Sequence, residues 1–309
     1  MLAAFVQSKD THSARFFFDT MPHRSVVSWN TMISALAHHG DLEEAGNLFD
    51  LMPDPDTVSW NTMIQAYTNA GKIDLAIAMF YEMNNRDIGV RAEEITFATA
   101  VDACAGIPSL RDGETIHRCA ADEGLDCDVV VGSAVINMYS KCGRLDRARG
   151  FFEKMAVKNT ITWNTLITAY ARNAPPQQTL QIFQEMQQHG IKADDVTTVC
   201  VLLAYSHGGL VAEGLSCFVF LVAEHGIRAT MEHYKCVTDL LCRAGREDEA
   251  RELIRGMPFH PDSLAWMILV GSCKSSWEVG GVAARAFELD PSEGSLYVLL
   301  SNLCKNSVS

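Results

Sequence analysis

The feature that most constrains the fold of this chain is a phrase that recurs along it. Residues 25–33 read SVVSWNTMI, residues 57–64 read TVSWNTMI, and residues 160–167 read TITWNTLI. When the residue after each Trp is aligned with its counterparts elsewhere, successive repeats lie 31 to 37 residues apart. Self-similarity at such a period predicts a solenoid, in which each repeat buries its apolar face only by stacking on its neighbours. A stack of this kind offers a long binding surface and is seldom an enzyme by itself.

One repeat, residues 26–56, shows how each is built. Apolar side chains at helical spacing, from Trp29 to Leu36, predict a first helix with one buried face. Gly40 is expected to end that helix, because glycine readily adopts the left-handed conformation common at helix C-termini. Asp41 is expected to cap a second helix, with Glu44 three residues on at the spacing of a capping box. The sequence therefore predicts a hairpin of two helices.

The same pattern continues through the chain. In four repeats an alanine follows the glycine break by five positions, where closely packed helices need a small side chain: Ala45, Ala76, Ala148 and Ala250. One repeat has Ala174-Pro-Pro176 in place of the glycine, which predicts a stiffer turn. The predicted array spans 26–262, with repeats at 26–56, 57–93, 94–128, 129–159, 160–194, 195–230 and 231–262. Residues 1–25 are interpreted as a truncated first repeat, and 263–309 as a distinct C-terminal region.

Composition limits the classes of function. The net charge is −13, which opposes nonspecific RNA binding unless the acidic residues face away from the binding surface. They do cluster in the predicted second helices, as at 41–44 and 247–249. No apolar run approaches the ~18 residues that a membrane span needs. The ten cysteines include no Cys-x-x-Cys pair, so we expect buried, small apolar side chains in a reducing compartment.

The repeats resemble the pentatricopeptide repeat family. The resemblance rests on the WNTMI starts, the breaks at AG, HG and CG, the central alanine, the terminal Phe-x-x-Met and the mixed repeat lengths. It is strongest for the plant PLS subfamily, whose long, short and standard repeats alternate, and residues 129–148 and 231–250 match that subfamily closely. It covers nearly the whole chain. It implies an all-α fold, a right-handed α-solenoid of helix-turn-helix repeats similar to that of tetratricopeptide repeat proteins.

Residues 264–302 are similar to the E motifs that follow the repeats in that subfamily. The matching residues are Trp266, Cys273, Gly280, Ala283, Ala284, Leu289, Pro291 and the run 297–302. The second E motif breaks off after Asn302, so the region 263–309 is expected to be truncated. The DYW-type cytidine deaminase domain that often comes next does not follow in this sequence.

What the family resemblance implies is binding of single-stranded RNA, one repeat per base. In this family the fifth and last residues of a repeat read the base: an amide offers hydrogen bonds to the base edge, and a carboxylate orients the amide. The pairs Asn30 with Asp56 and Asn164 with Asp194 are expected to favour uracil, Asn61 with Glu93 a pyrimidine, and Ser133 with Asn159 adenine. The pairs Ala98/Asp128, Val199/Thr230 and Lys235/Asp262 do not decode cleanly.

The second residues of four repeats, Val27, Val58, Val130 and Ile161, are expected to sandwich the bases. The predicted footprint, from 5′ to 3′, is U-pyrimidine-N-A-U-N-N. The resemblance further implies a role in organellar C-to-U editing, in the mitochondrion or the chloroplast, although no transit peptide is visible. The expected partners are single-stranded organellar RNA and, through 263–309, a DYW-type deaminase supplied in trans or other editing factors. No catalytic residue, metal, cofactor or membrane partner is expected.

The same residues admit other interpretations. Asn and Asp near helix ends are commonly caps and turn formers. The three Trp residues suit base stacking, but their helical spacing with Met32, Met63 and Leu166 places them in the core. The group His225, Glu232, His233 and Cys236 lacks the downstream Cys-x-x-Cys of a zinc deaminase. Two other classes of protein stay open: a tetratricopeptide-like scaffold that binds proteins, which the negative charge would suit, and a non-functional fragment of a longer editing factor.

Overall fold

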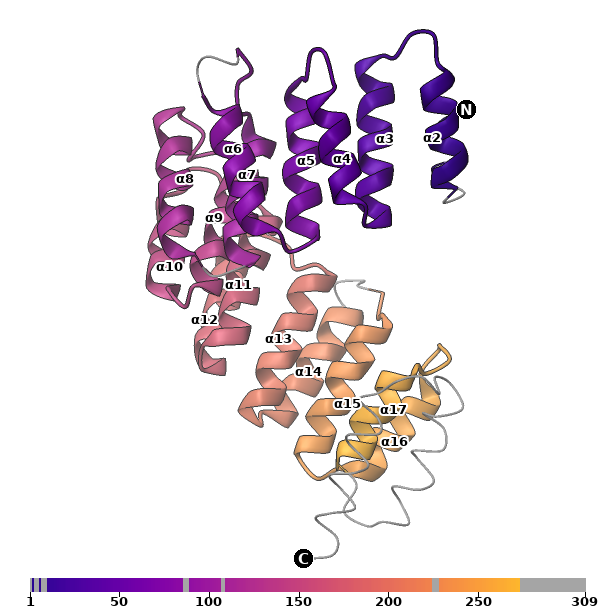
Figure 1. Cartoon of the computed structure of the whole chain (residues 1–309). Coiled ribbons are helices and arrows are strands. Elements are labelled where there is room, and N and C mark those ends of the chain that lie inside the picture. The colour runs from indigo at the N-terminus through magenta and orange to yellow at the C-terminus, as the bar shows by residue number, and fades with distance from the viewer. Residues whose placement is uncertain are drawn as a thin grey trace, which may run out of the picture. The chain divides into compact units, whose positions relative to one another are not determined.

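A computed structural model describes residues 10–85, 89–106, 109–223 and 228–272, together with Leu2 and Val6. These residues form 16 helices, and no strand occurs among them (Figure 1). The expected all-α fold is therefore confirmed for the described part of the chain. None of its helices is both long and apolar enough to cross a lipid bilayer.

Each predicted repeat contains a first and a second helix. The first helices are α3 (Val26–His39), α5 (Thr57–Asn69), α7 (Glu94–Gly106), α9 (Val129–Lys141), α11 (Thr160–Asn173), α13 (Asp195–Gly208) and α15 (Met231–Arg243). The second helices are α4 (Leu42–Asp50), α6 (Ile73–Met83), α8 (Leu110–Asp122), α10 (Leu145–Lys154), α12 (Pro176–Gln188), α14 (Val211–Ala223) and α16 (Glu247–Gly256). Helix α2 (Thr11–Thr20) precedes this array, and α17 (Ser263–Ser272) follows it.

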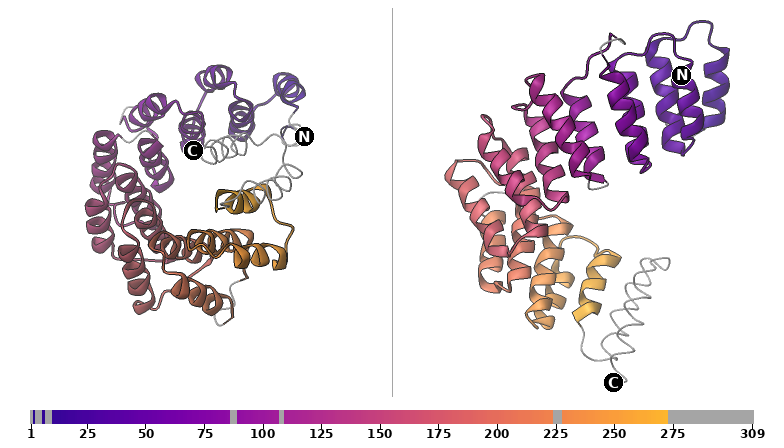
Figure 2. Two further views of the ribbon diagram at one scale, coloured as in Figure 1. Left: turned by 90° about the horizontal axis from the view of Figure 1, so that it is seen from below. Right: turned by 60° about the vertical axis from the view of Figure 1, so that its left-hand side comes forward.

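The chain divides into two compact units, residues 1–169 and 170–309, with the division inside α11. In the N-terminal unit the first helices α3, α5, α7 and α9 pack against one another in sequence order, and each also packs against the second helix of its own repeat. Seen end on, the first and second helices alternate between two rows (Figure 2). In the C-terminal unit α13, α15 and α17 pack in the same manner, with α14 and α16 beside them.

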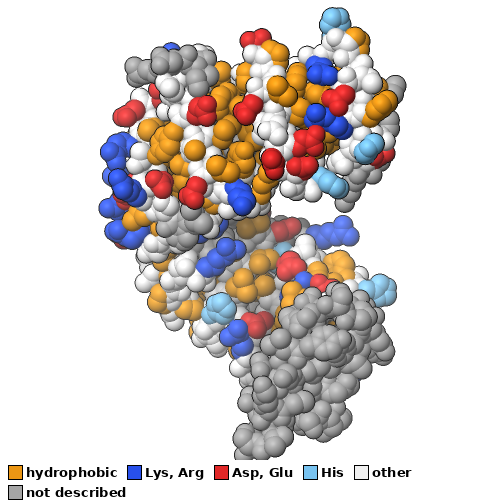
Figure 3. All heavy atoms as spheres, viewed as in Figure 1, with side chains coloured by type: hydrophobic (Ala, Val, Ile, Leu, Met, Phe, Trp, Pro, Cys, Tyr) orange, Lys and Arg blue, Asp and Glu red, His pale blue; other side chains and the backbone are white. Residues whose placement is uncertain are grey.

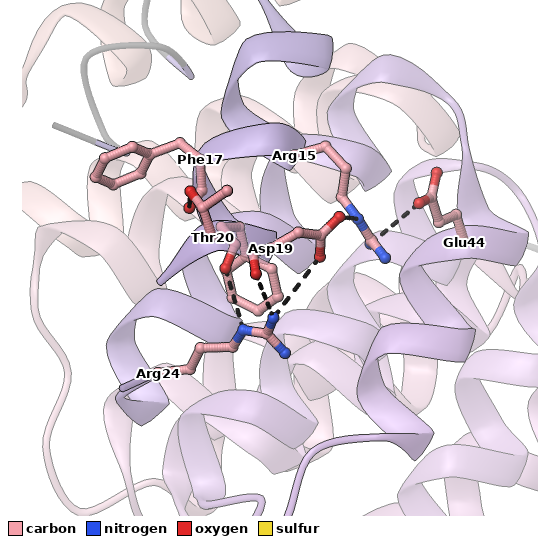
Figure 4. A network of polar contacts seen from close by, with 7 residues as sticks. Arg15, Phe17, Asp19, Thr20, Arg24 and Glu44 are labelled. Carbon is pink, nitrogen blue, oxygen red and sulfur yellow. Dashed lines mark hydrogen bonds and ion pairs between the residues drawn. The ribbon is translucent and has the colours of Figure 1, made fainter. Parts of the chain in front are cut away.

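The turn of the first full repeat forms as predicted. Gly40 has φ of 94°, in the left-handed region, and its N–H donates to carbonyls of the last helical turn. Asp41 then caps α4, because its carboxylate accepts the N–H of Glu44 at 3.2 Å. The Glu44 side chain makes no return bond to Asp41. It pairs instead with Arg15 of α2, at 3.0 Å, and so ties α2 to α4 (Figure 4).

A second arginine closes the end of α2. Arg24 donates from Nε to the carbonyl of Phe18 at 3.1 Å and from its terminal nitrogen to the carbonyl of Asp19 at 3.0 Å (Figure 4). The last carbonyls of a helix lack partners within the helix. Arg24 therefore satisfies two of them just before α3 begins.

The interiors of the repeats are closely packed. The four alanines predicted at close helix contacts, Ala45, Ala76, Ala148 and Ala250, are fully buried. The three Trp residues lie in the core as expected, with at most 7% of each exposed. At five junctions an aromatic ring from one repeat meets a ring of the next edge to face, with centroids 4.6 to 5.7 Å apart: Phe18–Trp29, Phe49–Trp60, Phe80–Phe97, Phe152–Trp163 and Phe218–Tyr234.

Candidate functional site

The last residue of every predicted repeat lies immediately before the first helix of the next repeat or, for the last repeat, before α17. Asp56 shows what this position does, because its Oδ1 accepts the N–H of Ser59 at 2.9 Å and the Ser59 hydroxyl at 2.8 Å. The Ser59 Oγ in turn accepts the Asp56 N–H, which completes a capping box at the start of α5. Asp128 caps α9 by accepting the N–H groups of Val130 and Val131. The position thus serves first as a helix N-cap.

Asp56 also reaches back to the preceding repeat. The amide Nδ2 of Asn30, on α3, donates to the same Oδ1 of Asp56 at 3.5 Å. Burial raises the pKa of the Asp56 carboxyl, but hydrogen bonds from Ser59 and Asn30 outweigh this effect and hold the pKa below 3.8. The carboxylate is therefore ionised at neutral pH, and it fixes which end of the Asn30 amide points toward α5. Capping and amide orientation are thus two uses of one oxygen atom.

Two other predicted pairs are placed differently within the N-terminal unit. Among the described contacts no hydrogen bond joins Asn61 to Glu93, whose N–H instead donates to the Thr96 hydroxyl at 3.2 Å. The Oδ1 atoms of Asn30 and Asn61 are both buried without a hydrogen-bond partner. A buried, unpartnered amide oxygen costs free energy unless a ligand or water satisfies it.

The pair Ser133 and Asn159 is also not joined directly in the described structure. The Ser133 hydroxyl donates to the carbonyl of Val129, one turn earlier in α9, at 2.8 Å. Asn159 caps α11 by accepting the N–H of Thr162 at 3.0 Å. Both side chains therefore have local partners that an incoming base would have to share or displace.

The fourth pair spans the two compact units. Asn164 is 8% exposed within the N-terminal unit. Asp194, in the C-terminal unit, caps α13 through Thr197, whose N–H and hydroxyl donate to Oδ1 at 2.9 and 3.0 Å. Each residue thus occupies the same kind of position in its repeat as Asn30 or Asp56.

The second residues of the repeats are exposed aliphatic side chains. Val27, Val58, Val130 and Ile161 are 52 to 73% exposed, although each lies in the first turn of a first helix that buries most of its other apolar side chains. Two further residues at this position, Ile95 and Val196, were not predicted and are 62% and 52% exposed. The signal that identifies them is their offset, three residues before the fifth position, as in the other repeats. The last repeat alone carries a charged residue there, Glu232.

A hollow of about 660 Å³ lies on this face, over α3, α5 and α7 of the N-terminal unit. Val58 and Ile95 line it together with Asn61 and Gln65 of α5 and with His38 of α3. No acidic side chain lines the hollow, even though the whole chain carries 38 of them. Its surface therefore combines aliphatic side chains with neutral hydrogen-bonding groups.

Charge is distributed unevenly between the two sets of helices. The seven first helices carry five acidic and four basic residues, whereas the seven second helices carry sixteen acidic and seven basic ones. Lys and Arg side chains gather over α8 and α10, away from the first-helix face of that unit (Figure 3). Several first helices end with an exposed basic residue in their last turn, including Lys141 and Arg172. The net negative charge therefore lies mainly on the second helices.

The residues considered for zinc serve a structural purpose where they are described. His233 is fully buried, and its Nδ1 accepts the N–H of Thr230 at 3.1 Å at the start of α15. His225 falls outside the described residues. Within the described part of the chain, no three His, Cys, Asp or Glu side chains are grouped to hold a metal ion.

Known families match this chain over most of the repeat array. The PPR repeat family matches at residues 55–106 and 158–207, and the PPR repeat matches at 27–54, 133–159 and 232–259. A chloroplastic pentatricopeptide repeat-containing protein of Arabidopsis thaliana is 38% identical over 98% of this chain and 32% of its own length. A mitochondrial one from the same plant is 32% identical over 98% of this chain and 59% of its own length. The chain spans about a third of the first of these relatives.

Solved structures show the same fold. The crystal structure of the pentatricopeptide repeat protein PPR10 from maize superposes with a TM-score of 0.65 at 21% identity, over 97% of this chain and 45% of PPR10. PPR10 in complex with an 18-nucleotide psaJ RNA element gives a TM-score of 0.72 at 17% identity, over 95% of this chain and 44% of PPR10. The likeness extends to the solenoid of helical hairpins.

Proposed function

Because this chain belongs to the pentatricopeptide repeat family, we propose that it binds single-stranded RNA with one repeat per base and acts as a specificity factor in organellar C-to-U editing. The observation that carries the proposal is the hydrogen bond between Asn30 and Asp56, in a repeat whose second residue, Val27, is an exposed aliphatic side chain. The exposed second residues of the repeats offer aliphatic surface to the faces of the bases. The fixed amide offers hydrogen bonds to a base edge.

The chemistry of a single repeat supports this assignment. With one N–H held by Asp56, the Asn30 amide keeps its second N–H for a base, and its Oδ1 has no hydrogen-bond partner within the described structure. Uracil presents acceptors on both sides of a donor, which such an amide matches. Each good contact of this kind discriminates by ~1–3 kcal/mol, by analogy with base reading in DNA. A handful of such repeats is enough to select a short sequence.

The charge distribution sets the expected salt dependence. Of the four basic residues in the first helices, Lys235 and Arg243 are engaged in ion pairs, which leaves Lys141 and Arg172 for phosphates. For single-stranded RNA, each phosphate that the protein neutralises adds about −0.7 to the slope of log K against log salt. Two such contacts predict a slope of only about −1 to −2. Most of the binding free energy would then come from contacts to the RNA bases rather than to the phosphate backbone.

The relatives support an organellar location and an RNA partner. The Arabidopsis proteins above are named chloroplastic and mitochondrial, which supports an organellar site of action. PPR10, whose fold this chain shares, was crystallised with RNA. The deaminase, in this proposal, is recruited in trans through 263–309. Of that region only α17 is described, so the E-motif residues from Cys273 onward lie outside the described residues.

The test is selection of the purified chain against a random pool of single-stranded RNA at fixed moderate salt. Enrichment of U-pyrimidine-N-A-U is expected, and the double change Ser133→Asn with Asn159→Asp should turn the adenine into uracil. Val58→Ala should weaken binding, whereas Leu51→Ala, at a residue 68% exposed on the adjacent loop, is the matched control that should leave it unchanged. Folded, helical protein that enriches no sequence would overturn the proposal and would direct attention to protein partners.

A further inference from the structure

The last repeat, residues 231–262, differs from the first full repeat at two of the three positions that the proposed function assigns to contact with a base. Its second, fifth and last residues are Glu232, Lys235 and Asp262, where the first full repeat has Val27, Asn30 and Asp56. An exposed aliphatic side chain is thus replaced by a carboxylate, and a neutral amide by an ammonium.

These three charged groups bind one another. The Lys235 Nζ lies 2.8 Å from Oε1 of Glu232 and 2.7 Å from Oδ2 of Asp262. The lysine side chain is only 9% exposed, whereas the two carboxylates are 61% and 45% exposed. An ammonium has three donors, so two of the three are already committed within the repeat. Burial lowers the pKa of Lys235, but the two carboxylates outweigh that effect and raise it, so the ammonium stays charged.

The triad also holds the start of the following helix. The Oδ1 of Asp262 accepts the N–H of Ala265 at 2.9 Å and so caps α17, while its Oδ2 binds Lys235. Asp56 in the first full repeat performs the same capping, but there its orienting partner is the Asn30 amide. The geometry of the last residue is therefore retained, and only the group that would face the base is changed.

We infer that the ion triad of Glu232, Lys235 and Asp262 closes the last repeat to base reading, so that the RNA footprint ends with the repeat at 195–230. This inference rests on the proposed function. A base seated here would meet a charged carboxylate in place of an aliphatic face, and it would have to compete with two ion pairs for the ammonium. The triad carries one net negative charge, which also repels the phosphate of an incoming nucleotide.

The triad makes a gain of function testable. The double change Glu232→Val with Lys235→Asn recreates the residues of the first full repeat, since Asp262 is already in place. In the random-pool selection this variant should enrich one additional uracil at the 3′ end of the footprint. The preference for uracil over the other bases there should be at least tenfold, whereas the unchanged chain should show none. Glu232→Val alone, which leaves Lys235 bound to Asp262, is the matched control and should add no preference.

The outcomes separate the inference from the proposed function. If the unchanged chain already selects a base at this position, or if the double variant stays folded and adds no uracil, the inference is wrong while the upstream footprint stands. If neither chain enriches any sequence, the proposed function itself fails. Circular dichroism shows that the variant is folded, and the retained upstream footprint shows that the other repeats still select their bases.

Discussion

His117 and Gly132 occupy, at one junction between repeats, the two positions that hold an aromatic pair at five other junctions. His117 is the twenty-fourth residue of its repeat, as are Phe49, Phe80 and Phe152. Gly132 is the fourth residue of the next repeat, where Trp29, Trp60, Phe97 and Trp163 stand elsewhere. The edge-to-face contact is therefore missing at this junction.

Other contacts replace it. The His117 ring turns onto Phe151, with centroids 4.9 Å apart, and its Nδ1 lies 3.3 Å from the Tyr139 hydroxyl. The space over Gly132 is filled by Met155, because a Cβ at Gly132 would lie 2.5 Å from the Met155 Cε. This junction is thus built from an imidazole and a thioether, where five others have two aromatic rings.

The aromatic junctions should be the more sensitive to truncation. Trp60→Ala should lower the free energy of unfolding by about 3–5 kcal/mol, since the side chain is 4% exposed and packs on Phe49. Trp60→Phe keeps an edge-to-face contact like that of Phe97 and removes an indole N–H that has no partner, so its cost should be far smaller. Urea denaturation followed by circular dichroism measures both. Equal losses for the two variants would contradict the packing role.

Acidic pH should destabilise the start of α15. Burial lowers the pKa of His233 below 6.5, more than the nearby Asp195 and Glu232 raise it, and its Nδ1 must be unprotonated to accept from Thr230. The unfolded chain therefore takes up the proton first. The stability that neutral His233 contributes is fully present above pH 6.5 and is lost as pH falls from there through the folded pKa.

The control for this pH dependence is His233→Thr. Threonine occupies the same capping position at Thr197, so the variant should keep the cap and lose the titration. Unfolding free energies measured from pH 7.5 to 5 should fall less steeply for the variant. His117, whose pKa burial also lowers, titrates in both proteins and cancels in the comparison. Identical pH profiles would show that His233 does not contribute.

Caps on the two kinds of helix should have different consequences. Asp41→Ala and Asp56→Ala each remove one N-cap and should each cost about 1 kcal/mol of stability. Only Asp56 also orients Asn30, so under the proposed function only Asp56→Ala should abolish selection of the first uracil. Thermal denaturation and RNA selection on the same two variants provide the comparison. Loss of that uracil in Asp41→Ala would show that selectivity follows stability alone.

Two glycine-to-alanine changes should have opposite signs. Gly40 has φ of 94°, and no atom lies within 4 Å of the point that a Cβ would occupy, so Gly40→Ala should cost about 1–2 kcal/mol from backbone strain alone. Gly150 lies inside α10 with equally open space, so Gly150→Ala should stabilise the protein by about 0.5–1 kcal/mol. Melting temperatures of the two variants should move in opposite directions. A shift in the same direction would contradict the left-handed turn at Gly40.

Local patterns were sufficient to predict much of the fold. The left-handed turn at Gly40, the cap at Asp41, the buried alanines and the buried Trp residues all follow from short-range rules of helix geometry. The capping-box spacing of Asp41 and Glu44 does not lead to a return bond, because the Glu44 carboxylate pairs with Arg15 of a neighbouring helix. Competition from a partner distant in sequence is not visible in a window of four residues.

The sequence by itself determined the repeat, its two helices and the residues at each register, because these depend on periodicity and on contacts within a few residues. Only the tertiary structure decided which of the paired positions meet. Asn30 reaches Asp56, whereas Asn61 makes no bond to Glu93, and Lys235 is held between two carboxylates. The physical reason is that hydrogen bonds and ion pairs between side chains of adjacent helices depend on ångström-scale placement, which repeat length and residue type do not specify.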